Sequence, residues 1–369
     1  MAEVIKDIQA QTGESYGSIV MAYAKLSMGP GKISFRDFVR LRLFDPALRE
    51  TADLNAFIGQ RRNRDICVTV NHRHDWLGML SNKVAALSYL AAYGFPVIPF
   101  AAFFAPGIAR GAATVLGDRA ALKAFLLRAP YPLFGKPTEG LQSLGTIGLR
   151  GLTPDGDGLE KIDGDILSID AFVEDIATHY DGGYVFQPMV RPHPAIAALC
   201  GPKLACVRLL TLLTESGPQI VRGCWKIPAG DNIADNYWRP GNLLASLDLA
   251  EGKINRVISG NGLELSEKRA HPDTGAALIG FRHPEWERMT ALALDGARLM
   301  RHVPLIGWDL ACAEQGPLIV EMNETPDFGL PQLVDRRGIY DETFRKFEQF
   351  QQRNEAAAIK EGKARLAKL

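Results

Sequence analysis

The chain contains two apolar runs near its end, LIGWDLA and LIVEMN, which are separated by the turn-like segment CAEQGP. Each run has the length and apolar content of a buried strand, and each carries one acidic residue. Side chains alternate between the two faces of a strand, so Glu321 and Asn323 share a face. If the runs pair as an antiparallel hairpin, Asp309 lies beside them. The sequence therefore predicts a group of oxygen-bearing side chains at one place on a sheet.

These three side chains form a candidate site for a divalent metal ion. Carboxylate and amide oxygens are hard ligands that suit Mg²⁺, which usually keeps several waters and takes further ligands from phosphates. Short patterns of this kind also occur by chance, and strand-end residues paired with lysines are the simpler interpretation of the motif taken alone. The magnesium hypothesis for Asp309, Glu321 and Asn323 therefore depends on phosphate-binding groups elsewhere in the chain.

Two lysines are candidates for that role. Lys136, in LFGKPTEGLQSLG, ends a predicted strand and precedes a loop rich in glycine and serine. A lysine supplies a point charge for phosphate, and exposed backbone N–H groups in such a loop can bind phosphate oxygens. Lys83, in SNKVAAL, precedes a predicted helix. An ordinary hairpin and a solvated helix start explain each feature alone, so only the combination indicates a phosphate site.

Charge balance and cysteine spacing exclude several classes of protein. Basic and acidic residues number 42 each, so no overall field favours nucleic acid or an anionic membrane. The five cysteines lack CxxC spacing, which argues against a disulfide framework or a structural zinc site and predicts a reducing cytoplasm. These cysteines are Cys67, Cys200, Cys206, Cys224 and Cys312.

The sequence of the N-terminal third indicates helices and gives no sign of a membrane-inserted segment. The start, MAEVIKDIQAQTGE, lacks the apolar region of a signal peptide. The uncharged segment 84–109 is long enough to span a bilayer, but Gly94 and several prolines interrupt it, so we expect a helix followed by a buried strand. Further along, KLACVRLLTLLTE and PQIVRGCWKIPA read as neighbouring strands, and 284–302 reads as a helix. The polar, turn-rich run 151–165 predicts exposed loops.

Four pieces of the chain resemble the ATP-grasp superfamily in their order: NKVAALSYLAAYGFPVIP, GKPTEGLQSLG, YVFQPMV and GWDLA…LIVEMNETPDFG. The chain looks most like the branch associated with sugar transfer and polysaccharide biosynthesis, and more distantly like D-alanine–D-alanine ligase. The resemblance covers residues 80 to 335, and its most specific part is the last piece. It implies an α+β ATP-grasp fold in which two α+β subdomains clamp ATP. Together with the resemblance, the residue patterns predict five divisions: a mainly helical region at 1–75, a helix and strand at 76–115, a lid subdomain at 116–190, a central and C-terminal subdomain with the metal site at 191–340, and a C-terminal surface helix at 341–369.

The resemblance also implies roles for individual residues. The two lysines would reach the ATP phosphates, a loop would close over them, and the YVFQPMV strand would lie beside adenine. Asp309, Glu321 and Asn323 would coordinate one or two Mg²⁺ ions, with Mn²⁺ as a substitute. The implied nucleotide-binding residues are Lys83, Lys136, Ser143, Gly145, Gln187 and, at the ribose, His193. The implied catalytic residues are Arg208 and Lys226, which would point toward the transferring phosphate or the substrate; solvent-facing charges on ordinary strands are the alternative.

Two departures from the ligase pattern concern the acceptor side. Ligase relatives carry an arginine two residues before the metal aspartate, whereas this chain has Gly307. Stabilisation of the oxyanion would then come from Arg208 or Arg239. The segment DNYWRPGN keeps Asn236 but alters a glycine pair that relatives carry, so Asn236 and Arg239 are predicted to border an acceptor site of different shape.

The function that this resemblance implies is that of an ATP-dependent carboxylate–amine ligase. A carboxylate would attack the γ-phosphate to give an acylphosphate, and an amine would then displace phosphate. The expected substrates are a small-molecule acid and amine belonging to a sugar, a cell-surface precursor or a secondary metabolite; homodimerisation is left open. One alternative is a small-molecule kinase that transfers phosphate to a hydroxyl. Another is a nucleotide-binding partner protein without catalysis.

Overall fold

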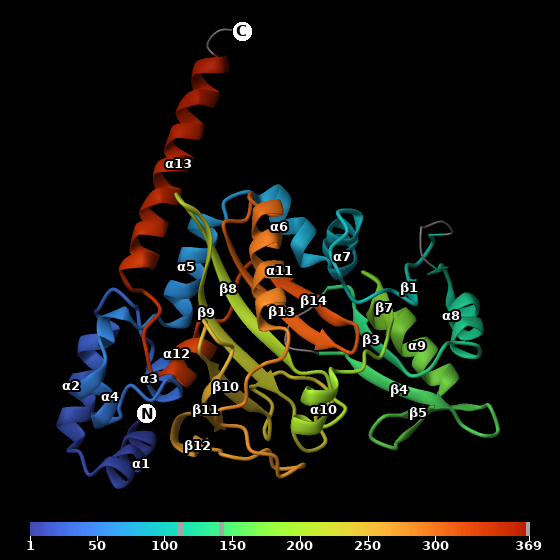
Figure 1. Cartoon of the computed structure of the whole chain (residues 1–369), viewed down its shortest axis with the longest axis horizontal. Helices are drawn as coiled ribbons and strands as arrows, with labels where there is room; N and C mark the ends of the chain where they lie inside the picture. Colours follow the sequence, from blue (N-terminus) through green and yellow to red (C-terminus); the bar gives the residue numbers. More distant parts are fainter. Residues whose placement is uncertain (109–113, 140–143, 367–369) are drawn as a thin grey trace.

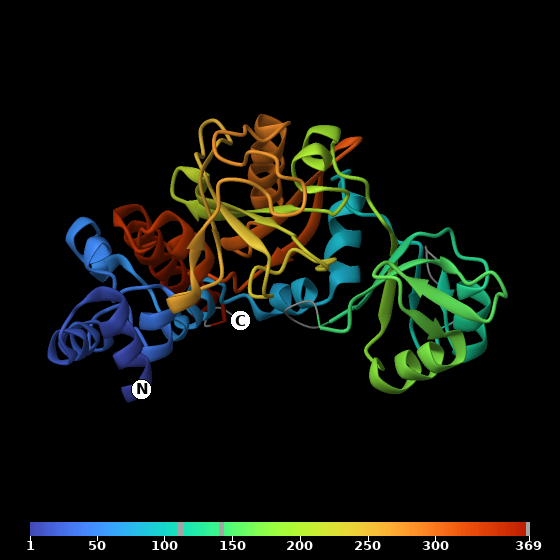
Figure 2. The same ribbon diagram turned by 90° about the horizontal axis from the view of Figure 1, so that it is seen from below.

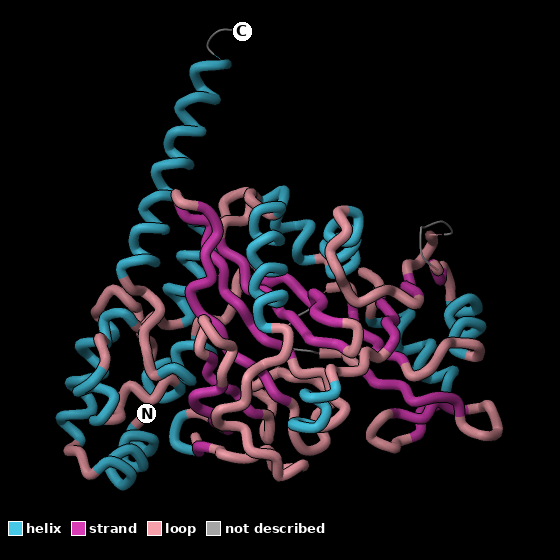
Figure 3. The backbone as a smooth tube through the Cα atoms, in the orientation of Figure 1, coloured by secondary structure: helices cyan, strands magenta, loops and turns pink. Residues whose placement is uncertain are grey.

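The computed structural model describes residues 1–108, 114–139 and 144–366, and its framework consists of two seven-stranded sheets (Figures 1 and 3). The larger sheet occupies the middle of the molecule, with the smaller sheet on one side and the first helices on the other (Figure 2). Because helices pack on sheets that are mainly antiparallel, the predicted α+β class is confirmed.

The larger sheet is antiparallel throughout, in the order β12-β11-β10-β9-β8-β13-β14. The predicted C-terminal hairpin is confirmed, since β13 and β14 pair with Asp309 opposite Glu321 and Gly307 opposite Asn323. The two predicted neighbouring strands are confirmed as β8 and β9. The strands are β8 (Cys206–Thr214), β9 (Gly217–Ile227), β10 (Leu243–Leu247), β11 (Ile254–Ser259), β12 (Ser266–Glu267), β13 (Leu305–Ala313) and β14 (Gly316–Asn323).

The smaller sheet has the order β2-β1-β7-β3-β4-β5-β6 and carries helices α8 and α9 on one face. Alternation along β3 places Leu133 on this helix-covered face and Lys136 on the other. The elements are β1 (Ala102–Phe104), β2 (Val115–Leu116), α8 (Arg119–Leu126), β3 (Leu133–Pro137), β4 (Ile147–Leu152), β5 (Gly158–Lys161), β6 (Ile166–Ser168), α9 (Ile169–His179) and β7 (Tyr184–Pro188).

The prediction that 151–165 forms exposed loops is wrong in part. Strand β5 lies within this run and pairs with both β4 and β6. Leu159 is fully buried among the residues under α9. A single apolar residue among polar neighbours gives no periodic signal in the sequence. This strand therefore depends on the packing of Leu159 against the helix, which the sequence does not show.

The two faces of the larger sheet are covered differently. On one face, α11 (Trp286–Leu299) lies against the sheet, and the predicted helix at 284–302 is thereby confirmed. Trp308 fills this interface so tightly that a Cβ on Gly296 would lie 2.6 Å from its ring. On the other face, Phe38 and Phe44 of the N-terminal region pack with Leu244 at one end of the sheet. The charged side chains of β8, β9 and β13 lie next to these apolar residues on the second face, since Leu244 is opposite Lys226 in the pairing of β10 with β9.

The remaining helices surround the larger sheet. The first 70 residues contain α1 to α5, and α6 and α7 lead toward the smaller sheet. Their bounds are α1 (Ala2–Thr12), α2 (Tyr16–Ser27), α3 (Phe35–Arg40), α4 (Pro46–Thr51), η1 (Leu54–Ala56), α5 (Gln60–Val70), α6 (His74–Ser81), α7 (Lys83–Ala92), α10 (Pro194–Cys200), η2 (Gly262–Glu264) and α12 (Gly329–Asp335).

The last helix, α13 (Glu342–Leu366), packs on the body through its first turns. Phe344 and Phe347 are buried, as are Glu348 and Gln351, and the later turns extend away from the body (Figure 1). The expectation of a surface helix is therefore wrong for its first turns, where Phe344 and Phe347 join a buried apolar cluster. Among the helices that the structure describes, none is both long enough and apolar enough to cross a bilayer.

Gln332 attaches the N-terminal region to α12, which packs against the larger sheet. Its buried side chain accepts from the backbone N–H of Ile58 at 2.8 Å and donates to the carbonyl of Ile58 at 2.9 Å. Gln332→Leu would leave both backbone groups unpaired, so we expect the free energy of unfolding to fall by roughly 2 to 4 kcal/mol. Chemical denaturation measures this change. Gln219→Leu, at an exposed glutamine, is the control, and equal effects of the two variants would contradict the assignment.

Candidate functional site

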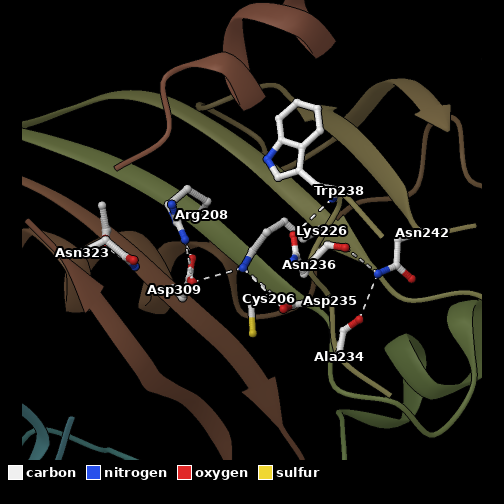
Figure 4. Close-up of polar contacts among 11 residues, drawn as sticks. Cys206, Arg208, Lys226, Ala234, Asp235, Asn236, Trp238, Asn242, Asp309 and Asn323 are labelled. Carbon is white, nitrogen blue, oxygen red and sulfur yellow. Dashed lines mark hydrogen bonds and ion pairs between the residues drawn. The ribbon is translucent and has the colours of Figure 1, made fainter. Parts of the chain in front are cut away.

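The centre of the candidate site is a buried group of three charges on adjacent strands (Figure 4). Asp309 of β13 lies opposite Arg208 of β8, whose guanidinium contacts both carboxylate oxygens through Nε and Nη2. The Nη2–Oδ2 distance is 2.7 Å. Lys226 of β9 donates to the same Oδ2 at 3.0 Å. The side chains of Arg208 and Lys226 are 12% and 8% exposed, so the alternative of solvent-facing charges is wrong.

These three groups hold one another in their charged forms. Burial by itself raises the pKa of Asp309, but Arg208 and Lys226 outweigh it and hold this pKa well below its ordinary range. Burial would likewise lower the pKa of Arg208 and of Lys226, yet the facing carboxylates raise both. An aspartate and two cations therefore persist where isolated charges would not.

The loop 228–242 supplies a second acid to this group. Asp235 accepts from Lys226 at 3.4 Å and from the backbone N–H of Cys206 at 3.0 Å. Lys226 is therefore held between two carboxylates. Asn242 fixes the loop from within, since its amide donates to the carbonyls of Ala234 and Asn236 (Figure 4). Sequence reasoning selected Asn236 and missed Asp235. The available signal was that Asp235 is an acid next to Asn236, in a loop that follows the strand with Lys226.

Glu321 and Asn323 lie on the same face as Asp309, as the alternation predicted. The Asn323 amide donates to the carbonyl of Gly307 at 3.4 Å. The carboxylate of Glu321 is 35% exposed and lies 3.8 Å from Nζ of Lys83. The three oxygen-bearing side chains thus occupy adjacent positions on two paired strands.

Lys83 and Lys136 come from different elements and meet near this face. The backbone N–H of Lys83, at the start of α7, donates to the carbonyl of Thr138 at 3.0 Å, just beyond Lys136. Lys136 is 7% exposed, and burial lowers its pKa. Lys83 lowers this pKa as well, whereas Glu321 and Asp309 oppose the shift. The buried lysine therefore lies within electrostatic reach of the acidic face.

The other predicted nucleotide-binding residues lie along the smaller sheet or beside it. Gln187 of β7 is buried on the same face as Lys136, and its amide donates to the carbonyl of Ile98 at 3.3 Å. Gly145 has a φ of +72°, and its carbonyl accepts from the hydroxyl of Tyr184. His193 caps α10, with Nδ1 accepting from the backbone of Ala195. Ser143 lies outside the described residues.

The unit formed by the smaller sheet and its helices also contains a hollow of about 370 Å³. It is lined by Ile147, Phe172 and Tyr184, which belong to the helix-covered face. Lys136 points from the opposite face of the smaller sheet, although the lining of the hollow also includes Gly145, and Ile233 of the loop 228–242.

The departure at Gly307 has a steric explanation. A Cβ at this position would lie 2.6 Å from Pro326 and 3.2 Å from Cδ of Arg208. The stem of Arg208 therefore passes over the place from which an arginine at 307 would extend. Arg239, the other candidate for the oxyanion, lies in the loop 228–242, where its backbone N–H donates to the carbonyl of Asn236.

The oxygen atoms of Asp309, Glu321 and Asn323 are of the chemical type that binds magnesium. Glu321 and Asn323 offer oxygen ligands at the more open end of the face, and Asp309 is the third. Both oxygens of Asp309 already accept from Arg208 and Lys226, so an ion would share this carboxylate with them.

Asp309→Asn should destabilise the fold because it leaves Arg208 and Lys226 buried with reduced compensation. We expect the free energy of unfolding to fall by about 3 to 5 kcal/mol at neutral pH. Asp295→Asn removes an exposed ion pair with Arg298 and should cost less than about 1 kcal/mol. The unfolded Asp309 carboxyl protonates near 3.8 and the folded one at lower pH, so the stabilisation is present above 3.8 and lost as pH falls below it. Chemical denaturation at a series of pH values should therefore show the free energies of unfolding of the wild type and Asp309→Asn converging in acid. A difference that widens as pH falls would contradict the buried pairing.

Comparison with known proteins assigns the chain to a family. The sugar-transfer associated ATP-grasp family matches residues 158–349, more than half of the chain. No curated protein matches it. The solved structures that are similar include an ADP complex of N5-carboxyaminoimidazole ribonucleotide synthetase (12% identity, TM-score 0.39), which covers 69% of this chain and of which this chain covers 47%. Two D-alanine–D-alanine ligases are also similar. The one from Helicobacter pylori has 12% identity and a TM-score of 0.41, and the match covers 74% of this chain and 61% of the ligase. The one from Bacillus anthracis has 13% identity and a TM-score of 0.41, and the match covers 77% of this chain and 70% of the ligase. This chain thus spans about half of the first of these proteins and less than two thirds of the second. The chain belongs to the sugar-transfer associated ATP-grasp family, and its two-sheet α+β architecture is an ATP-grasp fold.

Proposed function

We propose that this protein is an ATP-dependent carboxylate–amine ligase that works through an acylphosphate. ATP-grasp proteins are generally ATP-dependent ligases. The observation that carries the proposal is the buried contact of Asp309 with Arg208 and Lys226, one strand away from Glu321. Such a group combines cations for a reacting phosphate with oxygen ligands for a divalent ion.

The nucleotide would bind between the polar face of the smaller sheet and the acidic face of β13 and β14. Lys136 and Lys83 would neutralise the phosphates, and the loop that contains Ser143 and Gly145 would cover them. A buried lysine with a lowered pKa gains most from an incoming anion, because the anion favours its charged form. Gln187 would contact the adenine, since it lies on the same face as Lys136; His193 remains our proposal for the ribose.

Magnesium would be held by Glu321 and Asn323, with Asp309 as the third ligand. When bound, the ion supplies positive charge to the phosphate oxygens as negative charge accumulates on them. The protein's own contribution is to hold these three side chains on paired strands. Because the strands fix the backbone, the three ligands would need little rearrangement when the nucleotide arrives.

Arg208 and Lys226 would act on the transferring phosphate and the acid. Arg208 occupies the space above Gly307, so its guanidinium can replace the arginine that ligase relatives carry on the metal-binding strand. Lys226 lies between Asp309 and Asp235 and stays charged. Asn236 and Arg239, in the same loop as Asp235, would border the acceptor.

The reaction would proceed in two steps. A substrate carboxylate attacks the γ-phosphate, its new P–O bond forming as the bond to ADP breaks. An amine then attacks the acyl carbon, phosphate leaves, and the ammonium proton passes to solvent or to a nearby base. We propose an acid drawn from sugars, cell-surface precursors or secondary metabolites.

A screen with hydroxylamine tests this chemistry. ATP, magnesium and a panel of carboxylic acids are incubated with the protein, and hydroxylamine replaces the natural amine. Hydroxamate formation together with ADP and phosphate would establish the acylphosphate and identify the acid. ADP with a stable phosphorylated product would indicate a kinase and contradict the ligase.

Lys136→Met separates nucleotide binding from folding. Methionine fills the space of a buried lysine without its desolvation penalty, so we expect the apo variant to unfold at the same or a higher temperature. Its affinity for ADP should fall by roughly tenfold or more, since a phosphate contact to a charged group is lost. Calorimetric titration measures the affinity. Lys123→Met, at a half-exposed lysine of α8, is the control; unchanged ADP binding by Lys136→Met would refute the assigned role.

A further inference from the structure

An arginine from the N-terminal helices reaches the loop beside Lys226, although those helices lie outside the residues that the family matches. Arg40 ends α3, whose first turn is fixed by a capping box of Ser34 and Asp37. Its guanidinium carbon lies 3.3 Å from the centroid of the Trp238 ring. Its Nη2 donates to Oδ2 of Asp327 at 2.7 Å.

Trp238 and Asp327 complete a closed triangle with Arg40. The indole N–H of Trp238 donates to the same Oδ2 of Asp327 at 2.9 Å. The other oxygen of Asp327 accepts from the backbone of Gly329 at 2.8 Å. One carboxylate therefore joins α3, the loop 228–242 and the segment that follows β14. Charge-assisted bonds and cation–π stacking both fix orientation as well as distance.

Two corners of this triangle continue directly into the candidate site. The backbone N–H of Trp238 donates to the side chain of Asn236 at 3.1 Å, and the preceding Asp235 holds Lys226. Asp327 lies on the short segment after Asn323. The position of Trp238 is thereby linked to Lys226 through two neighbouring loop residues (Figure 4).

The chemistry of Arg40 is more specific than packing requires. Its side chain is 11% exposed, and within the described part of the chain its Nε is buried without a hydrogen-bond partner. An apolar side chain could fill this space without leaving a donor unsatisfied. A planar guanidinium is needed only to stack on the indole and bond the carboxylate at once.

We propose that Arg40 is a positioning residue of the active site, which fixes the acceptor-side loop 228–242 through Trp238 and Asp327. It would govern the KM for the acid or amine and leave nucleotide binding unchanged. The assignment of this loop to the acceptor rests on the proposed function, whereas the fixing of the loop does not.

Hydrogen–deuterium exchange of the full chain tests the fixing of the loop without any substrate. In Arg40→Ala, backbone amides of 231–242 should exchange about tenfold faster than in the wild type, since a cation–π contact and an ion pair are lost together. Arg40→Lys keeps the charge but not the planar stacking, so it should restore the protection only in part. Wild-type exchange in Arg40→Ala would overturn the proposal.

A chemically similar triangle provides the matched control. Arg62, also in the N-terminal region, bonds both oxygens of Glu348 at 2.9 Å and lies 5.5 Å from the ring of Tyr340, whose hydroxyl donates to the same glutamate. Arg62→Ala should leave exchange in 231–242 unchanged. Equal acceleration in both variants would mean general loosening and would overturn the specific role of Arg40.

Binding and kinetics test the second half of the proposal. Arg40→Ala should bind ADP with the wild-type affinity in calorimetric titration. With an acid from the hydroxylamine screen, its KM for that acid should rise about tenfold, in line with the lost stacking, while the KM for ATP stays constant. A matching change in ADP affinity would overturn the acceptor-side assignment. If the screen yields no hydroxamate while exchange in the loop still accelerates, the ligase function fails and the fixing of the loop by Arg40 stands.

Discussion

The buried contact of Asp309 with Arg208 and Lys226 is the interaction on which the site depends. Taking three charged groups out of water is costly, and a protein selected only for stability would do as well with apolar side chains there. The cost is offset because each charge has its opposite within hydrogen-bonding distance, with Asp235 as a fourth member. Removal of Asp309 would leave Arg208 without its carboxylate partner and Lys226 with Asp235 alone. The proposed function gives a reason for such a group, since it would hold charge ready for an incoming anion.

The strand order makes this contact achievable. Strand β8 lies between β9 and β13, so Arg208 faces Asp309 directly and Lys226 reaches it across one strand. On the same face, the apolar residues under the N-terminal helices border the charged residues, since Leu244 is opposite Lys226. Lys83 connects the two units, since its backbone bonds to Thr138 while its side chain lies near Glu321. The fold therefore sets the site at a junction that no single unit forms alone.

Alternation along strands sufficed to predict that Glu321 and Asn323 share a face with Asp309, because only local geometry was needed. The partners of Asp309 were beyond local reasoning, since they depend on which strands become neighbours, and Arg208 is 101 residues away. The resemblance selected Arg208 and Lys226, but without their contact to Asp309. Nothing local indicated Arg40, whose partner Asp327 is 287 residues distant. The prediction of exposed loops at 151–165 failed for a related reason, because the tertiary packing of Leu159 outweighed its polar sequence context.

Gly307 shows how a guanidinium can be supplied by a neighbouring strand. An arginine on β13 itself could change its rotamer independently of β8. Here Pro326 and the stem of Arg208 leave no room for any side chain at 307, so a guanidinium in this place must come from β8. Arg208 is then bound in two ways to Asp309, and its position follows the pairing of β8 with β13 rather than side-chain freedom. Under the proposed function, the geometry around the reacting phosphate would therefore be set by the pairing of β8 with β13.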